Sequence, residues 1–127
     1  MIRSASVLLV LLVCLSSCVE QPQRNCKDHH TGDYWVIIEQ NGKKDSTLIS
    51  RTEELQIEEY QQRRDTSYLR WLNDCEFVLR MANPKNKQEE KPLRFKIVSS
   101  DETSYAFEYS LVKDKGNPLK GVAIKKR

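Results

Sequence analysis

The chain has 127 residues, and its 21 Lys and Arg against 18 Asp and Glu give a formal net charge of +3. This near balance argues against a nucleic-acid-binding face, which needs a clear excess of basic residues. The length predicts one domain with a modest core and argues against two domains.

The N-terminal segment has the layout of a secretory signal peptide. Arg3 precedes the apolar run Val7–Val13, and the small residues Ser16 and Ser17 follow it. A charged start, a short apolar stretch and small residues at a cleavage site define such peptides. The run is too short to span a bilayer, which takes about 20 residues. We therefore expect an exported protein.

The end of this segment, Leu15-Ser16-Ser17-Cys18, resembles the lipobox of bacterial lipoproteins. The resemblance implies cleavage before Cys18, diacylglycerol on its sulfur and acylation of the new amine. Residues 1–17 would be the signal peptide, residues 18–25 the lipidated Cys with a polar tether, and residues 26–127 the folded domain. Val19 stands where many inner-membrane lipoproteins have Asp, so we expect a lipid anchor in the cell envelope, at the outer membrane rather than the inner one.

Two cysteines remain for the folded domain, Cys26 and Cys75. An even pair in an oxidising compartment predicts one disulfide, here closing a loop of about 50 residues. The alternative is a metal site that adds His29 and His30 to the two cysteines. Zinc sites usually show two tight ligand pairs, and Cys75 stands alone. We expect the disulfide, no metal and no cofactor.

The rest of the chain reads as a series of strands joined by turns. Period-2 alternation or β-branched and aromatic residues predict strands at 34–38, 46–50, 55–60, 67–72, 75–81, 93–97 and 105–111, and a last strand from 122. Asn41-Gly42 predicts a tight type I′ hairpin. Further turns are expected at Asn73-Asp74 and at 116–118, with a polar stretch at 61–65 and a charged loop at 83–92.

Residues 55–60 also carry a helical signature. Ser50 and Glu53 have the spacing of a capping box, and Glu59 and Arg63 are four residues apart. Apolar residues nevertheless alternate with polar ones as in a half-buried strand, with Leu55 and Ile57 on the same face, so we favour a strand.

These strands predict an all-β domain. Seven or eight antiparallel strands, each with one apolar face, must curl to bury that face. We expect a small barrel, closed or incomplete, or a two-sheet sandwich. Trp35 and Trp71 are expected to help fill its core.

Parts of this pattern resemble a family of small uncharacterised lipoproteins of Gram-negative bacteria. The resemblance covers residues 26–80 and rests on Cys26, Gly32, Tyr34, Arg51-Thr52, Trp71 and Cys75-Glu76-Phe77. Some members carry a topoisomerase-type name, but an exported domain of about 110 residues has no room for a DNA-cleaving core or an ATPase. The family has no established activity, so the resemblance implies no functional residues.

Catalytic histidines are not indicated. Asp28, His29 and His30 are the only histidine-centred candidates, and no Ser or Thr lies in a nucleophile-elbow motif that would complete a triad. We expect them to be exposed polar residues at the start of the domain. The protein is therefore predicted not to be an enzyme.

The charged residues of the predicted strands have two interpretations. Glu53, Glu54, Glu58 and Glu59 could include a catalytic carboxylate pair, but neighbours in a strand face opposite ways, so we expect a solvated strand edge. Arg51 and Arg70 could bind an anion in a barrel mouth, but we expect them on the wet face or paired with glutamates.

Tyr105, Phe107 and Tyr109 share one strand face. Such a stripe is most often core and alternatively lines a ligand cavity. The function we favour is a non-enzymatic, lipid-anchored envelope protein that binds a small apolar ligand or an envelope protein partner. The alternative is a structural or assembly lipoprotein with a solid core. A continuous apolar cavity would favour the ligand binder, and an exposed apolar patch would favour a protein partner.

Overall fold

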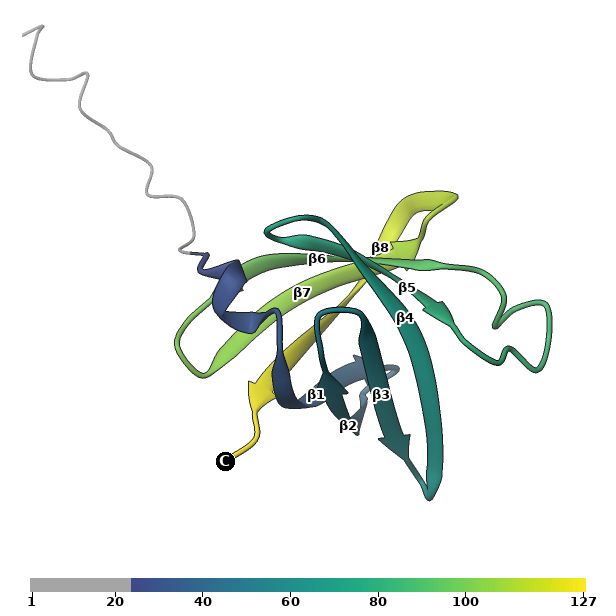
Figure 1. Cartoon of the computed structure of the whole chain (residues 1–127), viewed down its shortest axis with the longest axis horizontal. Helices are drawn as coiled ribbons and strands as arrows, with labels where there is room; N and C mark the ends of the chain where they lie inside the picture. Colours follow the sequence, from purple (N-terminus) through teal and green to yellow (C-terminus); the bar gives the residue numbers. More distant parts are fainter. Residues whose placement is uncertain (1–23) are drawn as a thin grey trace, which may run out of the picture.

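The computed structural model describes residues 24–127, and within them eight antiparallel strands close into a barrel (Figure 1). A short 3-10 helix, η2 (Cys26–His29), precedes the barrel. The strands follow in order as β1 (Gly32–Gln40), β2 (Lys43–Arg51), β3 (Leu55–Tyr60), β4 (Arg63–Asn73), β5 (Glu76–Met81), β6 (Leu93–Ser100), β7 (Ser104–Leu111) and β8 (Asp114–Lys125). The predicted all-β meander is confirmed, and the strand at 55–60 is a strand rather than a helix.

Each strand pairs with its neighbours in the chain, and β8 pairs with β1 to close the sheet. Because every strand is hydrogen-bonded on both sides, the sheet formed within residues 24–127 has no free edge. This part of the chain has no helix of the length and apolar character that crossing a bilayer requires. The predicted signal peptide, the lipidation site Cys18 and the tether up to residue 23 lie outside the described residues.

Two hairpin turns have residues with left-handed backbone, but only one of these turns is recognisable from the sequence. Asn41 and Gly42 have φ of 53° and 76°, which confirms the predicted turn. Gln61 and Gln62 have φ of 46° and 66° without any glycine, Asn or Asp. The predicted polar stretch at 61–65 is therefore a two-residue turn, and β4 begins at Arg63.

The predicted turn at residues 116–118 is wrong, because β8 runs through it. The chain reverses before Asp114 instead. Tyr109 faces Leu119 and Leu111 faces Asp114, so β8 has more residues than β7 between these partners and leaves the regular ladder. Pro118 lies in this irregular stretch, where its missing N–H breaks no ladder hydrogen bond.

Alternate turns of an up-and-down barrel lie at the same end. At the closed end, η2 packs on the β4–β5 and β6–β7 turns: His30 Nε2 is 2.8 Å from Asp74 O, and Asn25 N donates to Ser100 Oγ at 2.6 Å. The opposite end, here called the mouth, carries the turns at 41–42 and 61–62 and the long loop 82–92. Figure 1 shows η2 and this loop on opposite sides of the barrel.

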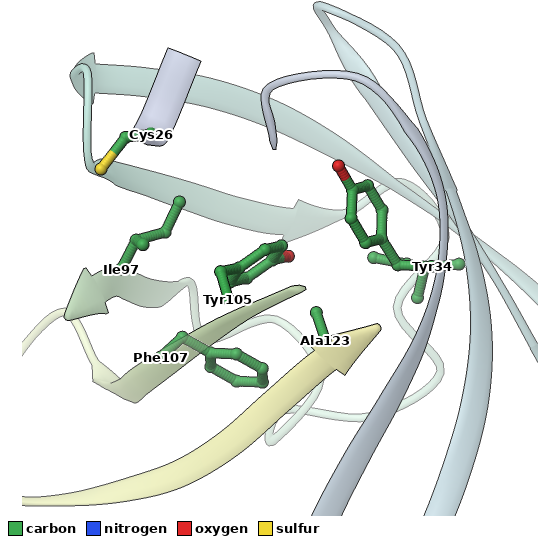
Figure 2. Close-up of a cluster of buried hydrophobic side chains, with 7 residues drawn as sticks. Cys26, Tyr34, Ile97, Tyr105, Phe107 and Ala123 are labelled. Carbon is green, nitrogen blue, oxygen red and sulfur yellow. The ribbon is translucent and has the colours of Figure 1, made fainter. Parts of the chain in front are cut away.

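The core fills the closed end. Figure 2 shows Tyr105 and Phe107 of β7 beside Ile97 of β6 and Ala123 of β8, with Tyr34 of β1 across from them. A second cluster around Phe77 adjoins it: Phe77, Leu69 and Leu79.

The two tryptophans differ from the expectation that both fill the core. Trp35 is 42% exposed, because Tyr34 and Val36 take the inward positions of β1, so that prediction is wrong. Trp71 does pack against the core, with its ring 3.5 Å from that of His30.

Candidate functional site

The barrel encloses a hollow between its core and its mouth. Its volume is about 190 Å³. Side chains from β1, β2, β6 and β7 make up most of its wall: Val36, Ile38, Thr47, Ile49, Leu93, Phe95, Tyr105, Phe107 and Tyr109. The rest of the wall is polar and comes from the end of β2 and from β3: Arg51, Gln56 and Glu58. Such a lining, mostly apolar with a few polar groups, is typical of a small-molecule site.

A second hollow of about 260 Å³ lies beside the first and shares Glu58 and Leu93 with it. Its outer wall includes Gln88, Glu89 and Lys91 from the 82–92 loop. The loop is held in place by Glu89, which accepts a hydrogen bond from the backbone N–H of Lys85 at 3.0 Å and pairs with Arg63 at 2.8 Å. A second pocket, walled in part by the loop at the mouth, thus adjoins the interior hollow.

A larger hollow, of about 680 Å³, lies on the outer wall over β1, β7 and β8. It is open to solvent, and four charged side chains border it: Glu39, Lys44, Glu108 and Lys120. It would bury less of a small ligand than the interior does.

Strand β3 turns its polar face inward. Gln56 is buried and Glu58 is partly buried against the hollow, so Leu55 and Ile57 take the opposite face. This reverses the expectation that Leu55 and Ile57 face the core and that Glu58 lies on a solvated strand edge. The register explains the reversal, because Gln56 is the partner of Arg51 across β2 and β3.

Arg51 is the most unusual residue of the site. Only 4% of it is exposed, so the expectation of a wet face is wrong, whereas Arg70 is exposed as expected. The guanidinium of Arg51 makes three hydrogen bonds. Its Nε donates to Gln56 Oε1 at 3.0 Å, its Nη1 to His29 O at 3.0 Å and its Nη2 to Tyr105 Oη at 2.8 Å. The guanidinium also stacks over Phe77 at 4.7 Å from the ring centre, a cation–π geometry.

Gln56 connects the buried Arg51 to the partly buried Glu58. It accepts from Arg51 through its carbonyl and donates through Nε2 to Glu58 Oε1 at 3.0 Å. Burial raises the pKa of Glu58 above its ordinary value, and the nearby carboxylate of Asp65 adds to the rise. The hydrogen bond from Gln56 and the charge of Arg51 oppose it without cancelling it.

His29 is fully buried, and the expectation of an exposed polar residue is wrong for it. Its Nε2 lies 2.8 Å from Asp101 O, and since a carbonyl only accepts, Nε2 carries the proton. In the neutral ring, Nδ1 then accepts from the Tyr34 hydroxyl at 2.9 Å. Both nitrogens are engaged within the fold, which makes His29 a structural residue that holds η2 on the barrel. Asp28 is exposed, as expected.

The predicted Cys26–Cys75 disulfide is confirmed, with the two Cα atoms 5.1 Å apart. Cys75 lies in the turn before β5 rather than in the strand itself. Because both sulfurs are bonded to each other, neither is a thiolate available to the alternative metal site.

The three aromatic residues predicted for β7 are brought together on the wall of the hollow. Tyr105 and Phe107 are also buried in the core, and burial raises the pKa of Tyr109. Their role in ligand binding stays a prediction. Gln56 and Glu58 were not predicted to face inward. The inward position of Arg51 could have been predicted, because Arg51 lies two positions from the apolar Ile49 and so shares its face.

Comparison with known protein families, curated proteins and solved structures finds no match to this chain.

Proposed function

We propose that this chain is a lipid-anchored envelope protein whose barrel binds a small apolar ligand in its interior, without catalysing a reaction. The observation that carries the proposal is the interior hollow of about 190 Å³. A cavity of about 150 Å³ in a protein core is large enough to bind benzene. The alternative of a solid, purely structural core is less well supported because a second pocket adjoins this hollow at the mouth.

The position of Asn25 and Cys26, at the start of the described residues, supports an anchored orientation. Asn25 is bonded to Ser100 at the closed end, and Cys26 is crosslinked there. The eight chain steps from Cys18 to Cys26 span at most about 29 Å. A lipid on Cys18 would therefore hold the closed end toward the membrane and leave the mouth facing away from it, open to ligand.

The interior site is tested by filling it. Val36 lines the hollow, whereas its neighbour Ile37 faces the outer wall. Val36→Trp should abolish binding of octan-1-ol measured by calorimetry on residues 24–127, and Ile37→Trp should leave it intact. Circular dichroism and thermal melting check that both variants fold. Equal binding by Val36→Trp and the unaltered domain would show that the interior is not the site.

The anchor is tested separately in cells that export the full chain. Cys18→Ser should abolish labelling by a palmitate analogue and release the protein from membranes, because no acyl chain could then be attached. A Cys18→Ser protein that stays fully membrane-bound would contradict the lipoprotein part of the proposal.

A further inference from the structure

We infer that the ligand is an amphiphile with a carboxylate headgroup, which binds Arg51 and Tyr105 while its apolar tail lies in the hollow. This inference rests on the proposed interior binding function and adds the chemical class of the ligand. It is drawn from the hydrogen bonds of Arg51, from its missing counter-charge and from the position of Glu58.

Arg51 has donors to spare. A guanidinium carries five N–H groups, and three of the Arg51 groups bond to Gln56, His29 and Tyr105. Within residues 24–127, one N–H on each terminal nitrogen has no hydrogen-bond partner. Arg51 belongs to the wall of the hollow, which places its side chain beside a ligand bound there.

Arg51 also lacks an ionic partner. The ion pairs formed within residues 24–127 are Arg63–Asp65, Arg63–Glu89 and Arg94–Glu76, and none involves Arg51. Glu58 reaches it only through the amide of Gln56. A buried charge without a direct counter-charge is unfavourable. An anion in the hollow would supply the missing charge where burial makes the interaction strongest.

A carboxylate fits the available donors. The planar guanidinium fork matches the two oxygens of a carboxylate. Tyr105 accepts a hydrogen bond from Arg51, which leaves the proton of its own hydroxyl free to donate to the same anion. Both side chains belong to the wall of one hollow, so their donors can converge on one headgroup.

Glu58 sets the direction of the ligand. It belongs to both hollows and therefore marks the boundary toward the mouth. An ionised Glu58 would repel a carboxylate placed there, whereas Arg51 at the far side attracts it. The headgroup therefore enters first, and the tail lies against Val36, Ile38 and Phe95 and points to the mouth. By comparison with the benzene cavity, the interior holds a tail of about six to eight carbons.

The test compares octanoate with octan-1-ol, which share a tail length and differ in the headgroup. On residues 24–127 at neutral pH, calorimetry should show octanoate binding at least about tenfold more tightly. Arg51→Gln should bring the two affinities together, and Arg70→Gln, which alters an exposed arginine, should leave the preference unchanged. Tyr105→Phe keeps the guanidinium and should reduce the preference severalfold; it tests the headgroup site even if Arg51→Gln fails to fold.

The outcomes separate this inference from the proposed function. If octan-1-ol binds as tightly as octanoate, or if Arg51→Gln folds and keeps the full preference, the carboxylate inference is overturned while interior binding stands. If neither compound binds the unaltered domain, the proposed binding function itself is overturned.

Discussion

Removal of the disulfide should weaken the barrel substantially. The bond joins residues 49 apart in sequence, and the loop-closure model assigns such a crosslink about 4 kcal/mol through restriction of the unfolded chain. A domain of this size has a total stability of about 5–15 kcal/mol. Cys26→Ala combined with Cys75→Ala should therefore lower the free energy of unfolding by about 4 kcal/mol and the Tm by about 15–30 °C.

The folded structure adds a local effect. Cys26 is buried and packs in the main core cluster, so its replacement also removes contacts at the closed end. His29 and Arg51 still hold η2 through their hydrogen bonds. We therefore expect a destabilised domain that keeps the barrel, with the closed end loosened first.

The assay is urea denaturation of the oxidised domain, of the single variants Cys26→Ala and Cys75→Ala, and of the double variant. Each single variant should lose about as much stability as the double variant, because all three lack the same bond, so the losses should be strongly non-additive. A loss below about 1 kcal/mol in the double variant, or losses that simply add, would refute this reasoning.

Three further predictions concern the barrel wall and its turns. A Cβ on Gly121 would lie 2.5 Å from the Phe107 ring, so Gly121→Ala should cost about 1–3 kcal/mol in urea denaturation; Phe107→Leu should relieve most of this cost, and additive losses would contradict the contact. Gln62 has φ of 66°, so Gln62→Gly should raise the stability by about 1 kcal/mol, and an unchanged or lower urea midpoint would be inconsistent with a strained turn. Burial raises the pKa of Glu58, so its proton stabilises the fold at low pH, and this contribution is lost as the pH rises through the raised pKa. Glu58→Gln should therefore be more stable than the unaltered domain at pH 7, with the difference shrinking toward about pH 4; a pH-independent difference would exclude this cause.

The alternation of apolar and polar residues predicts the strands well, because side chains in a strand repeat with a period of two and each strand is several residues long. It predicts less well which face is inside. In β1 both faces are apolar, and only the acidic Asp33 and Glu39, on the same face as Trp35, indicate that Trp35 lies outside. In β3 the apolar pair Leu55 and Ile57 lies outside because the register pairs Gln56 with Arg51. Side-chain pairing across strands decides the orientation there, and a single strand does not contain that information.

Turn chemistry has a similar limit. Asn41-Gly42 is recognisable because glycine adopts positive φ without strain. The Gln61–Gln62 turn is imposed by the strands on either side, which pair up to Tyr60 and Arg63. Local sequence preference is overridden there, just as the glycine and proline of residues 116–118 are absorbed into an irregular part of β8.

Methyl NMR of residues 24–127 titrated with octanoate tests most directly whether the barrel interior is the binding site. The interior methyl groups of Val36, Ile38 and Ile49 should shift in a saturable way, while those of Ile37 and Val122 on the outer wall should not. Shifts confined to the outer methyl groups, or no saturable shift at any of them, would contradict a ligand site inside the barrel.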